Sequence, residues 1–187
     1  MKTARIFGLT VVLFLLLAGT ALAVDLTNRI GVGFNNQLSY GIIGSDSKML
    51  TNAYLTNQGI SVKYWATRDI AIEGVLGFLY SDFQNTGGWG LTLGGKFIYN
   101  LVYEKQMNLY TGGGLAILPV HTDNGHDSHT KTGFSFMGFV GAEFFFRDFP
   151  NLGFDLEFGL QYLDFDEYRQ FGTFGGGFTT FGIRYYF

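Results

Sequence analysis

Apolar residues that recur at every second position constrain this chain more than any other feature. From Phe154 to Tyr162 every second residue is apolar, while Asp155 and Glu157 take the other parity. Successive side chains of a β-strand point to opposite faces, so this period predicts strands with one apolar face. Eight segments carry the pattern, and together they predict an all-β fold: 28–36, 54–66, 70–81, 89–102, 108–120, 134–147, 153–164 and 174–187.

The N-terminus has the organisation of a secretory signal peptide. Two cations, Lys2 and Arg5, precede an apolar run over residues 6–18, and an Ala-Leu-Ala cleavage sequence ends at Ala23. The apolar run is short for a membrane-spanning helix, which needs about 20 residues. The sequence therefore predicts a cleaved signal peptide, residues 1–23, and one domain, residues 24–187.

The composition does not suit a water-soluble domain. Charged residues make up 14% of the chain and aromatic residues 18%, whereas soluble domains carry about 25% charged residues. Twelve basic residues stand against fifteen acidic ones without a basic patch, which excludes nucleic acid as a partner. The chain has no cysteine, so thiolate chemistry is excluded. No motif predicts a cofactor.

The connections between the predicted strands alternate between short and long. Short ones are expected at 66–69, 103–107 and 148–151, and long polar ones at 37–53, 82–88, 121–133 and 165–173. Short periplasmic turns and long external loops are typical of outer-membrane barrels, whose strands need about 9 to 11 residues to cross a bilayer. The order predicts an eight-stranded antiparallel up-and-down transmembrane β-barrel with both termini in the periplasm.

The parity of the strands also separates the charges from the apolar side chains. If the more apolar face points outward, residues such as Phe78, Phe97 and Phe158 meet lipid. A cation near the bilayer centre costs about 2 to 4 kcal/mol, so charges are expected inside. Six residues, three of each sign, are predicted to form ion pairs in a plugged lumen: Lys63, Glu73, Lys96, Glu143, Glu157 and Arg184. A soluble sandwich, whose charges also avoid the apolar face, is the alternative.

The last seven residues, FGIRYYF, alternate up to an aromatic C-terminus. Four of them share the outward parity: Phe181, Ile183, Tyr185 and Phe187. This segment resembles the assembly signal of Gram-negative outer-membrane barrels, and the whole domain is similar to the small OmpA-like and OmpX-like barrel proteins. The resemblance implies insertion by the barrel-assembly machinery into an outer membrane, contact with its lipid and lipopolysaccharide, and a monomeric state.

A polar segment, residues 121–129, contains every histidine of the chain. Imidazoles beside carboxylates can bind zinc or copper, which makes His121, His126 and His129 candidate metal ligands. His126 and Ser128 are also weakly similar to the His-x-Ser element of lipid A deacylases, in which the serine is the nucleophile and the histidine its base. The alternative is a solvated external loop, because Asp, Asn, Gly and Ser favour turns.

The sequence thus favours an integral outer-membrane protein of structural or surface-interaction type, without catalysis. Two other functions stay open. A deacylase-like enzyme would remove acyl chains from lipid A in a reaction that depends on Ser128. A narrow pore for small solutes would conduct ions, and more strongly once lumen pairs such as Glu73 and Lys96 are cut.

Overall fold

The structure is a computed structural model that describes residues 25–41, 54–83, 86–123, 128–166, 168–173 and 180–187. The predicted signal peptide lies outside these residues. In the part of the chain that is described, no helix is long and apolar enough to cross a membrane.

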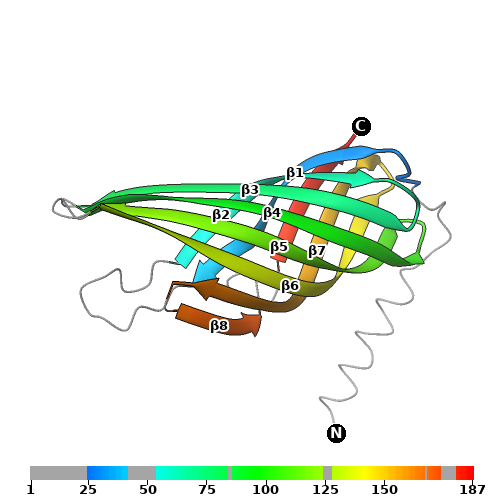
Figure 1. The fold of residues 1–187 in the computed structure, drawn as a ribbon. Helices are drawn as coiled ribbons and strands as arrows, with labels where there is room; N and C mark the ends of the chain where they lie inside the picture. The colour runs from blue at the N-terminus through cyan, green and yellow to red at the C-terminus, as the bar shows by residue number, and fades with distance from the viewer. Residues whose placement is uncertain (1–24, 42–53, 84–85, 124–127, 167, 174–179) are drawn as a thin grey trace, which may run out of the picture.

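The described strands form one closed antiparallel sheet (Figure 1). Each strand from β1 to β7 pairs with the next, and β9 pairs with both β7 and β1, which closes the ring. The strands are β1 (Ile30–Gly41), β2 (Tyr54–Trp65), β3 (Ile70–Phe83), β4 (Thr86–Tyr103), β5 (Met107–Asp123), β6 (Ser128–Phe146), β7 (Phe149–Phe165), β8 (Tyr168–Thr173) and β9 (Thr180–Tyr186).

The last two segments share one place in the barrel wall. Strand β8 pairs with residues 160–165 of β7, and β9 pairs with residues 152–157 of the same strand. They are successive parts of the eighth wall position, so the barrel has eight strands. The predicted all-β, eight-stranded up-and-down barrel is confirmed.

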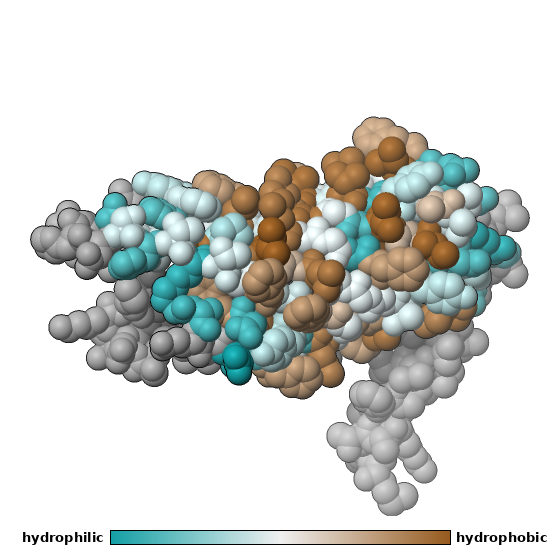
Figure 2. Space-filling view, in the orientation of Figure 1, coloured by the Kyte–Doolittle hydropathy of each residue, from teal (hydrophilic) through white to brown (hydrophobic). Residues whose placement is uncertain are grey.

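The outer surface is apolar around the middle of the barrel. Figure 2 shows hydrophobic side chains gathered there and more hydrophilic ones toward both ends of the visible face. Residues predicted to face outward are exposed, namely Phe78, Phe97, Phe158, Phe181 and Tyr185. In lipid every backbone polar group needs a partner within the protein, and a closed barrel supplies all of them. This lipid-facing belt marks the fold as a transmembrane barrel.

The strands are longer than predicted at the end away from the short turns. The predicted loop 82–88 is mostly strand, because β3 ends at Phe83 and β4 begins at Thr86. Likewise β5 and β6 extend into 121–133, and β8 occupies part of the predicted loop 165–173. Beyond the lipid both faces of a strand meet water, so the backbone ladder continues where the apolar alternation has ended. The expectation of long loops at these three places is wrong.

Two apolar clusters fill the lumen at different heights. The turn-side cluster extends inward from the short turns and consists of Leu26, Trp65, Ala71, Ile98, Tyr110, Met137, Phe139, Phe145 and Tyr186. The far-side cluster consists of Val75, Ala116, Leu118 and Leu163, with Phe165 packed against it. In β3 the successive inward residues are Ala71, Glu73 and Val75, so a charge lies between the two clusters.

Candidate functional site

Seven charged side chains are buried in the lumen, interleaved with the turn-side cluster, and the far-side cluster lies beyond them. Each is at most 5% exposed. They come from six strands: Lys63 (β2), Glu73 (β3), Lys96 (β4), Glu143 (β6), Asp155 and Glu157 (β7) and Arg184 (β9). The structure therefore brings together all six residues predicted for the lumen, and adds Asp155. These seven residues are the lumen cluster.

Arg184 links strands from different sides of the barrel. Its Nη2 lies 2.5 Å from Glu73 Oε1 and donates to Ser61 Oγ at 2.9 Å. Its Nη1 lies 3.3 Å from Glu143 Oε1 and 3.3 Å from Asp155 Oδ1. A guanidinium presents donors in a fixed planar fork, so one side chain can contact several carboxylates at once.

Lys96 lies between two carboxylates, those of Glu73 and Glu157. Its Nζ lies 3.0 Å from Glu73 Oε2, and 3.1 and 3.0 Å from the two oxygens of Glu157. The hydroxyl of Tyr110 donates to Glu157 Oε1 at 2.8 Å. Lys96 of β4 therefore links Glu73 of β3 to Glu157 of β7 by two ion pairs. Ions buried this deeply are tolerated only when they are paired and hydrogen-bonded.

Lys63 and Glu143 form the part of the lumen cluster that touches the turn-side cluster. Lys63 Nζ lies 3.2 Å from Glu143 Oε2 and 4.9 Å from the ring centroid of Tyr110, within cation–π range. Tyr186 donates its hydroxyl to Glu143 Oε1 at 2.7 Å and accepts from the indole of Trp65 at 3.3 Å. The phenol and indole groups thus join the charges to the apolar packing.

Inward glycines make room for these long side chains. A Cβ at Gly31 would lie 2.5 Å from Cδ of Arg184, and one at Gly141 would lie 2.8 Å from Cγ of Glu157. A Cβ at Gly182 would collide with the carboxylate of Asp155. Real Cβ atoms do not approach this closely, so the lumen cluster depends on side-chain-free positions on the neighbouring strands.

The lumen cluster carries one more carboxylate than cations. Glu73, Glu143, Asp155 and Glu157 face three cations, so the expected neutral balance omitted Asp155. Asp155 has the same parity as Glu157 two residues later, and that signal was available in the sequence. Its Oδ2 has no hydrogen-bond partner among the described residues. Asp155 is therefore the least well-paired acid of the lumen cluster.

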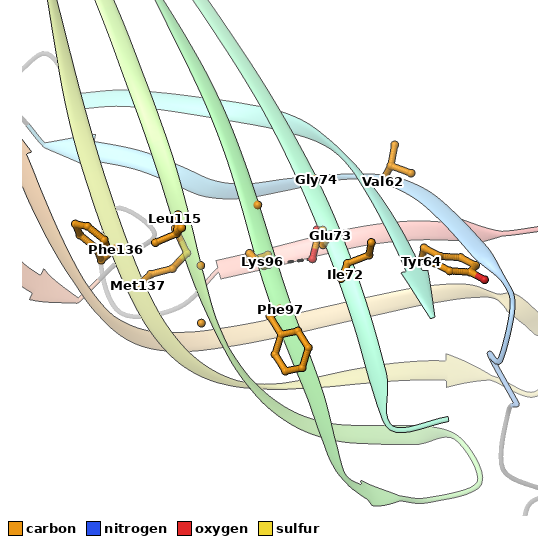
Figure 3. Close-up of a pocket in the computed structure, with 13 residues that line it drawn as sticks. Val62, Tyr64, Ile72, Glu73, Gly74, Lys96, Phe97, Leu115, Phe136 and Met137 are labelled. Carbon is orange, nitrogen blue, oxygen red and sulfur yellow. Dashed lines mark ion pairs between the residues drawn. The ribbon is translucent and has the colours of Figure 1, made fainter. Parts of the chain in front are cut away.

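Outside the lumen cluster the barrel wall has a depression with a volume of about 1110 Å³ (Figure 3). Its sides are lipid-facing side chains of β2 to β6, namely Val62, Ile72, Phe97, Leu115 and Phe136, and the ion pair between Glu73 and Lys96 lies behind its floor. Gly74, Gly95 and Gly113 line its floor, and Gly138, which pairs with Gly113, lies beside it. The glycine window is defined here as this depression together with Gly74, Gly95, Gly113 and Gly138.

The structure places Ser128 beside His121. His121 pairs with Thr130 in the sheet, with 2.9 Å between its Nδ1 and Thr130 Oγ1, and its Nε2 lies 3.4 Å from Ser128 Oγ. Trp89 stacks on the same imidazole with 5.8 Å between ring centroids. A catalytic triad needs a carboxylate on the ring nitrogen that faces away from the serine, and here a hydroxyl occupies that position. The predicted base, His126, lies outside the described residues.

Two of the candidate metal ligands point to opposite faces of the β5–β6 hairpin. Directly paired residues share a face, and His129 pairs with Thr122, the neighbour of His121. His121 and His129 cannot therefore bind one ion. The third candidate, His126, lies outside the described residues. No group of three or more His, Asp or Glu side chains that could hold a metal occurs among the residues described.

Comparisons with known proteins identify the fold. No protein-family profile and no curated protein matches this sequence. The N-terminal β-barrel domain of Pseudomonas aeruginosa OprF superposes with a TM-score of 0.56 at 15% identity, covering 86% of this chain and 98% of the domain. Neisserial surface protein A gives 0.53 at 14% identity, with 85% and 96% covered. Ail, the attachment invasion locus protein of Yersinia pestis, gives 0.51 at 15% identity, with 86% and 99% covered. The chain therefore has the fold of the small eight-stranded outer-membrane β-barrel proteins.

Proposed function

We propose that the chain is an outer-membrane protein of structural or surface-interaction type whose barrel is sealed. The observation that carries this proposal is the filling of the lumen: the lumen cluster is packed among the residues of the turn-side cluster, and the far-side cluster lies beyond it. The proposed role is passive: the barrel anchors the chain, and the hairpins beyond the lipid contact other molecules.

The order of side chains along the strands supports a closed lumen. Entering from the turns, an ion would first meet Trp65 and Tyr186, each at most 1% exposed, before it reached Lys63 and Arg184. From the other end it would meet the far-side cluster. Apolar constrictions exclude water and hydrated ions. Each cation of the lumen cluster already contacts at least one carboxylate.

The pairing of the last strand with the first supports the proposed role of the C-terminus and the placement of both ends in the periplasm. Phe187 donates its backbone N–H to Ile30 at 2.9 Å, and Arg29 donates to the carbonyls of Tyr186 at 3.1 Å and Phe187 at 3.2 Å. The last residue therefore completes the ladder at the end that carries the short turns. We expect the barrel-assembly machinery to recognise the C-terminal strand, and lipid and lipopolysaccharide to surround a monomer.

The contacts of His121 disfavour the enzyme alternative. A deacylase needs an acid that orients the histidine, and the nitrogen of His121 that faces away from Ser128 contacts Thr130 instead. Glu143 does not fill this role because it is fully buried in the lumen and paired with Lys63.

The exposed aromatic surface of Trp89 and Tyr80, which pair across β3 and β4, suits contact with sugars or headgroups.

Two measurements test the proposal. First, the purified, heat-modifiable protein is added to planar bilayers, and we expect no discrete single-channel currents. Channels that change when Glu73 is replaced by Gln would instead establish the pore.

Second, a short epitope is inserted between Asp123 and Ser128, and a matched one between Glu104 and Gln106. Antibody should label intact cells only for the first insertion. Labelling of the second in intact cells would invert the proposed orientation.

A further inference from the structure

The glycine window is an unusual feature for a lipid-facing wall. Gly74 pairs directly with Gly95, and one row further along the strands Gly113 pairs directly with Gly138. Gly74, Gly95 and Gly138 are exposed. A Cβ built on any of these three meets no atom within 4 Å. We propose that this window binds one acyl chain of a membrane lipid; the inference rests on the proposed membrane location.

Nothing inside the barrel requires glycine at these positions. Glycine weakens a strand, and in strands it usually marks a positive φ, a bulge, a tight bend of the barrel wall, crowding or the close approach of another molecule. None of the four has a positive φ, and the pairing of β3 with β4 and of β5 with β6 runs without a register shift. Crowding is absent at Gly74, Gly95 and Gly138. Two causes remain, a bend of the wall and a group that approaches the bare backbone from outside, and only the second also accounts for the apolar depression above the glycines.

The side chains around the glycine window indicate that the group approaching from outside is apolar. The rim consists of Val62, Ile72, Phe97, Leu115 and Phe136 and is continuous with the lipid-facing belt. The backbone N–H and C=O groups of the floor belong to the paired strands, so the floor offers no free polar group. The molecules that contact this belt in a bilayer are lipid chains, which can follow a depression one side chain deep.

A second copy of the barrel fits the window less well. A two-fold interface places the same patch of both subunits face to face. The exposed rings of Phe97 and Phe136 would then meet first and hold the two glycine floors apart. A flexible methylene chain has no such obstacle. It would also cover the thin wall in front of the Glu73–Lys96 ion pair.

Filling the window tests the proposal. Wild type, Gly95→Leu and a control are reconstituted in phosphatidylcholine vesicles that contain a lipid spin-labelled near the middle of its chain. The control is Leu156→Phe, which enlarges a lipid-facing residue of β7 outside the window. Electron paramagnetic resonance then counts the motionally restricted lipids per barrel.

We expect Gly95→Leu to lose one restricted lipid relative to wild type, while Leu156→Phe keeps the wild-type number. Phe97→Ala, which removes one wall of the depression, should also reduce the number. Equal counts in wild type and Gly95→Leu, with both proteins heat-modifiable, would overturn the acyl-chain site. Failure of wild type to insert as a heat-modifiable barrel would overturn the membrane location itself. Repeating the measurement with lipid A in the vesicles shows which lipid supplies the chain.

Discussion

Arg184 Nη2 lies 2.5 Å from Glu73 Oε1, although the two residues are 111 positions apart in sequence and lie on strands that do not pair with each other. The contact crosses the inside of the barrel from β9 to β3. It ties the strand that closes the ring to a strand formed much earlier along the chain. The lumen cluster therefore contributes to closure as well as to filling.

Replacing Arg184 by Met should strongly destabilise the barrel. The change leaves Glu73, Glu143 and Asp155 without their shared cation while their burial is kept. Loss of one partner of a buried ion pair costs about 3 to 5 kcal/mol. Urea titration in lipid vesicles, followed by tryptophan fluorescence, measures the free energy of unfolding. A value equal to that of wild type would mean that the lumen cluster does not hold the closing strand.

Two acids of β7 should respond differently to neutralisation. Asp155→Asn should stay within about 1 kcal/mol of wild type, because it removes the surplus charge and keeps an acceptor for Arg184. Glu157→Gln should lose at least about 2 kcal/mol, because Glu157 accepts from both Lys96 and Tyr110. The same urea titration compares the two variants. Equal losses would show that Asp155 is a full partner in the lumen cluster.

Phe187→Ala should impair assembly in cells without weakening the folded barrel. The backbone bond from residue 187 to Ile30 remains, and the lost side chain is 73% exposed. Exposed substitutions change stability by about 0.5 kcal/mol. The heat-modifiable fraction in cells should fall to a small part of the wild-type amount, while refolding into detergent micelles is unchanged. Phe171→Ala, at another exposed aromatic, is the control, and an equal fall there would rule out a terminal signal.

Ser128→Ala should leave lipid A unchanged. The neighbouring imidazole of His121 has a hydroxyl in place of the orienting acid, so Ser128 is not activated as a nucleophile. Mass spectrometry of lipid A from cells that express wild type or the variant is the measurement. Acyl chains missing with wild type and restored with Ser128→Ala would reinstate the deacylase.

The membrane-spanning part of the fold could be predicted from sequence because a lipid environment permits few backbone structures. A closed ladder and one apolar face per strand are both obligatory there, so the parity of residues such as Phe158 and Glu157 sorts outside from inside. The structure buries every charge that this parity assigned to the lumen. Asp155 obeys the same rule, so its inward position is also predictable from its parity with Glu157.

Features that lipid does not constrain could not be predicted from the sequence. Beyond the lipid no face must be apolar, so the extension of β5 through Asp123 and of β6 from Ser128 left no periodic signal. The neighbours of His121 depend on the register of this hairpin, and a shift by one residue would exchange the two faces. The glycine window likewise requires the register of four strands, which brings Gly74 to Gly95 and Gly113 to Gly138.

The extension of β3 to β6 beyond the lipid has a consequence for recognition. A partner that meets a loose loop must first freeze its backbone, and that loss of freedom weakens the complex. Here much of the projecting backbone is already fixed by ladder bonds between β4, β5 and β6. A molecule that binds this surface would meet a nearly rigid backbone. Any conformational change on binding would therefore occur in the partner.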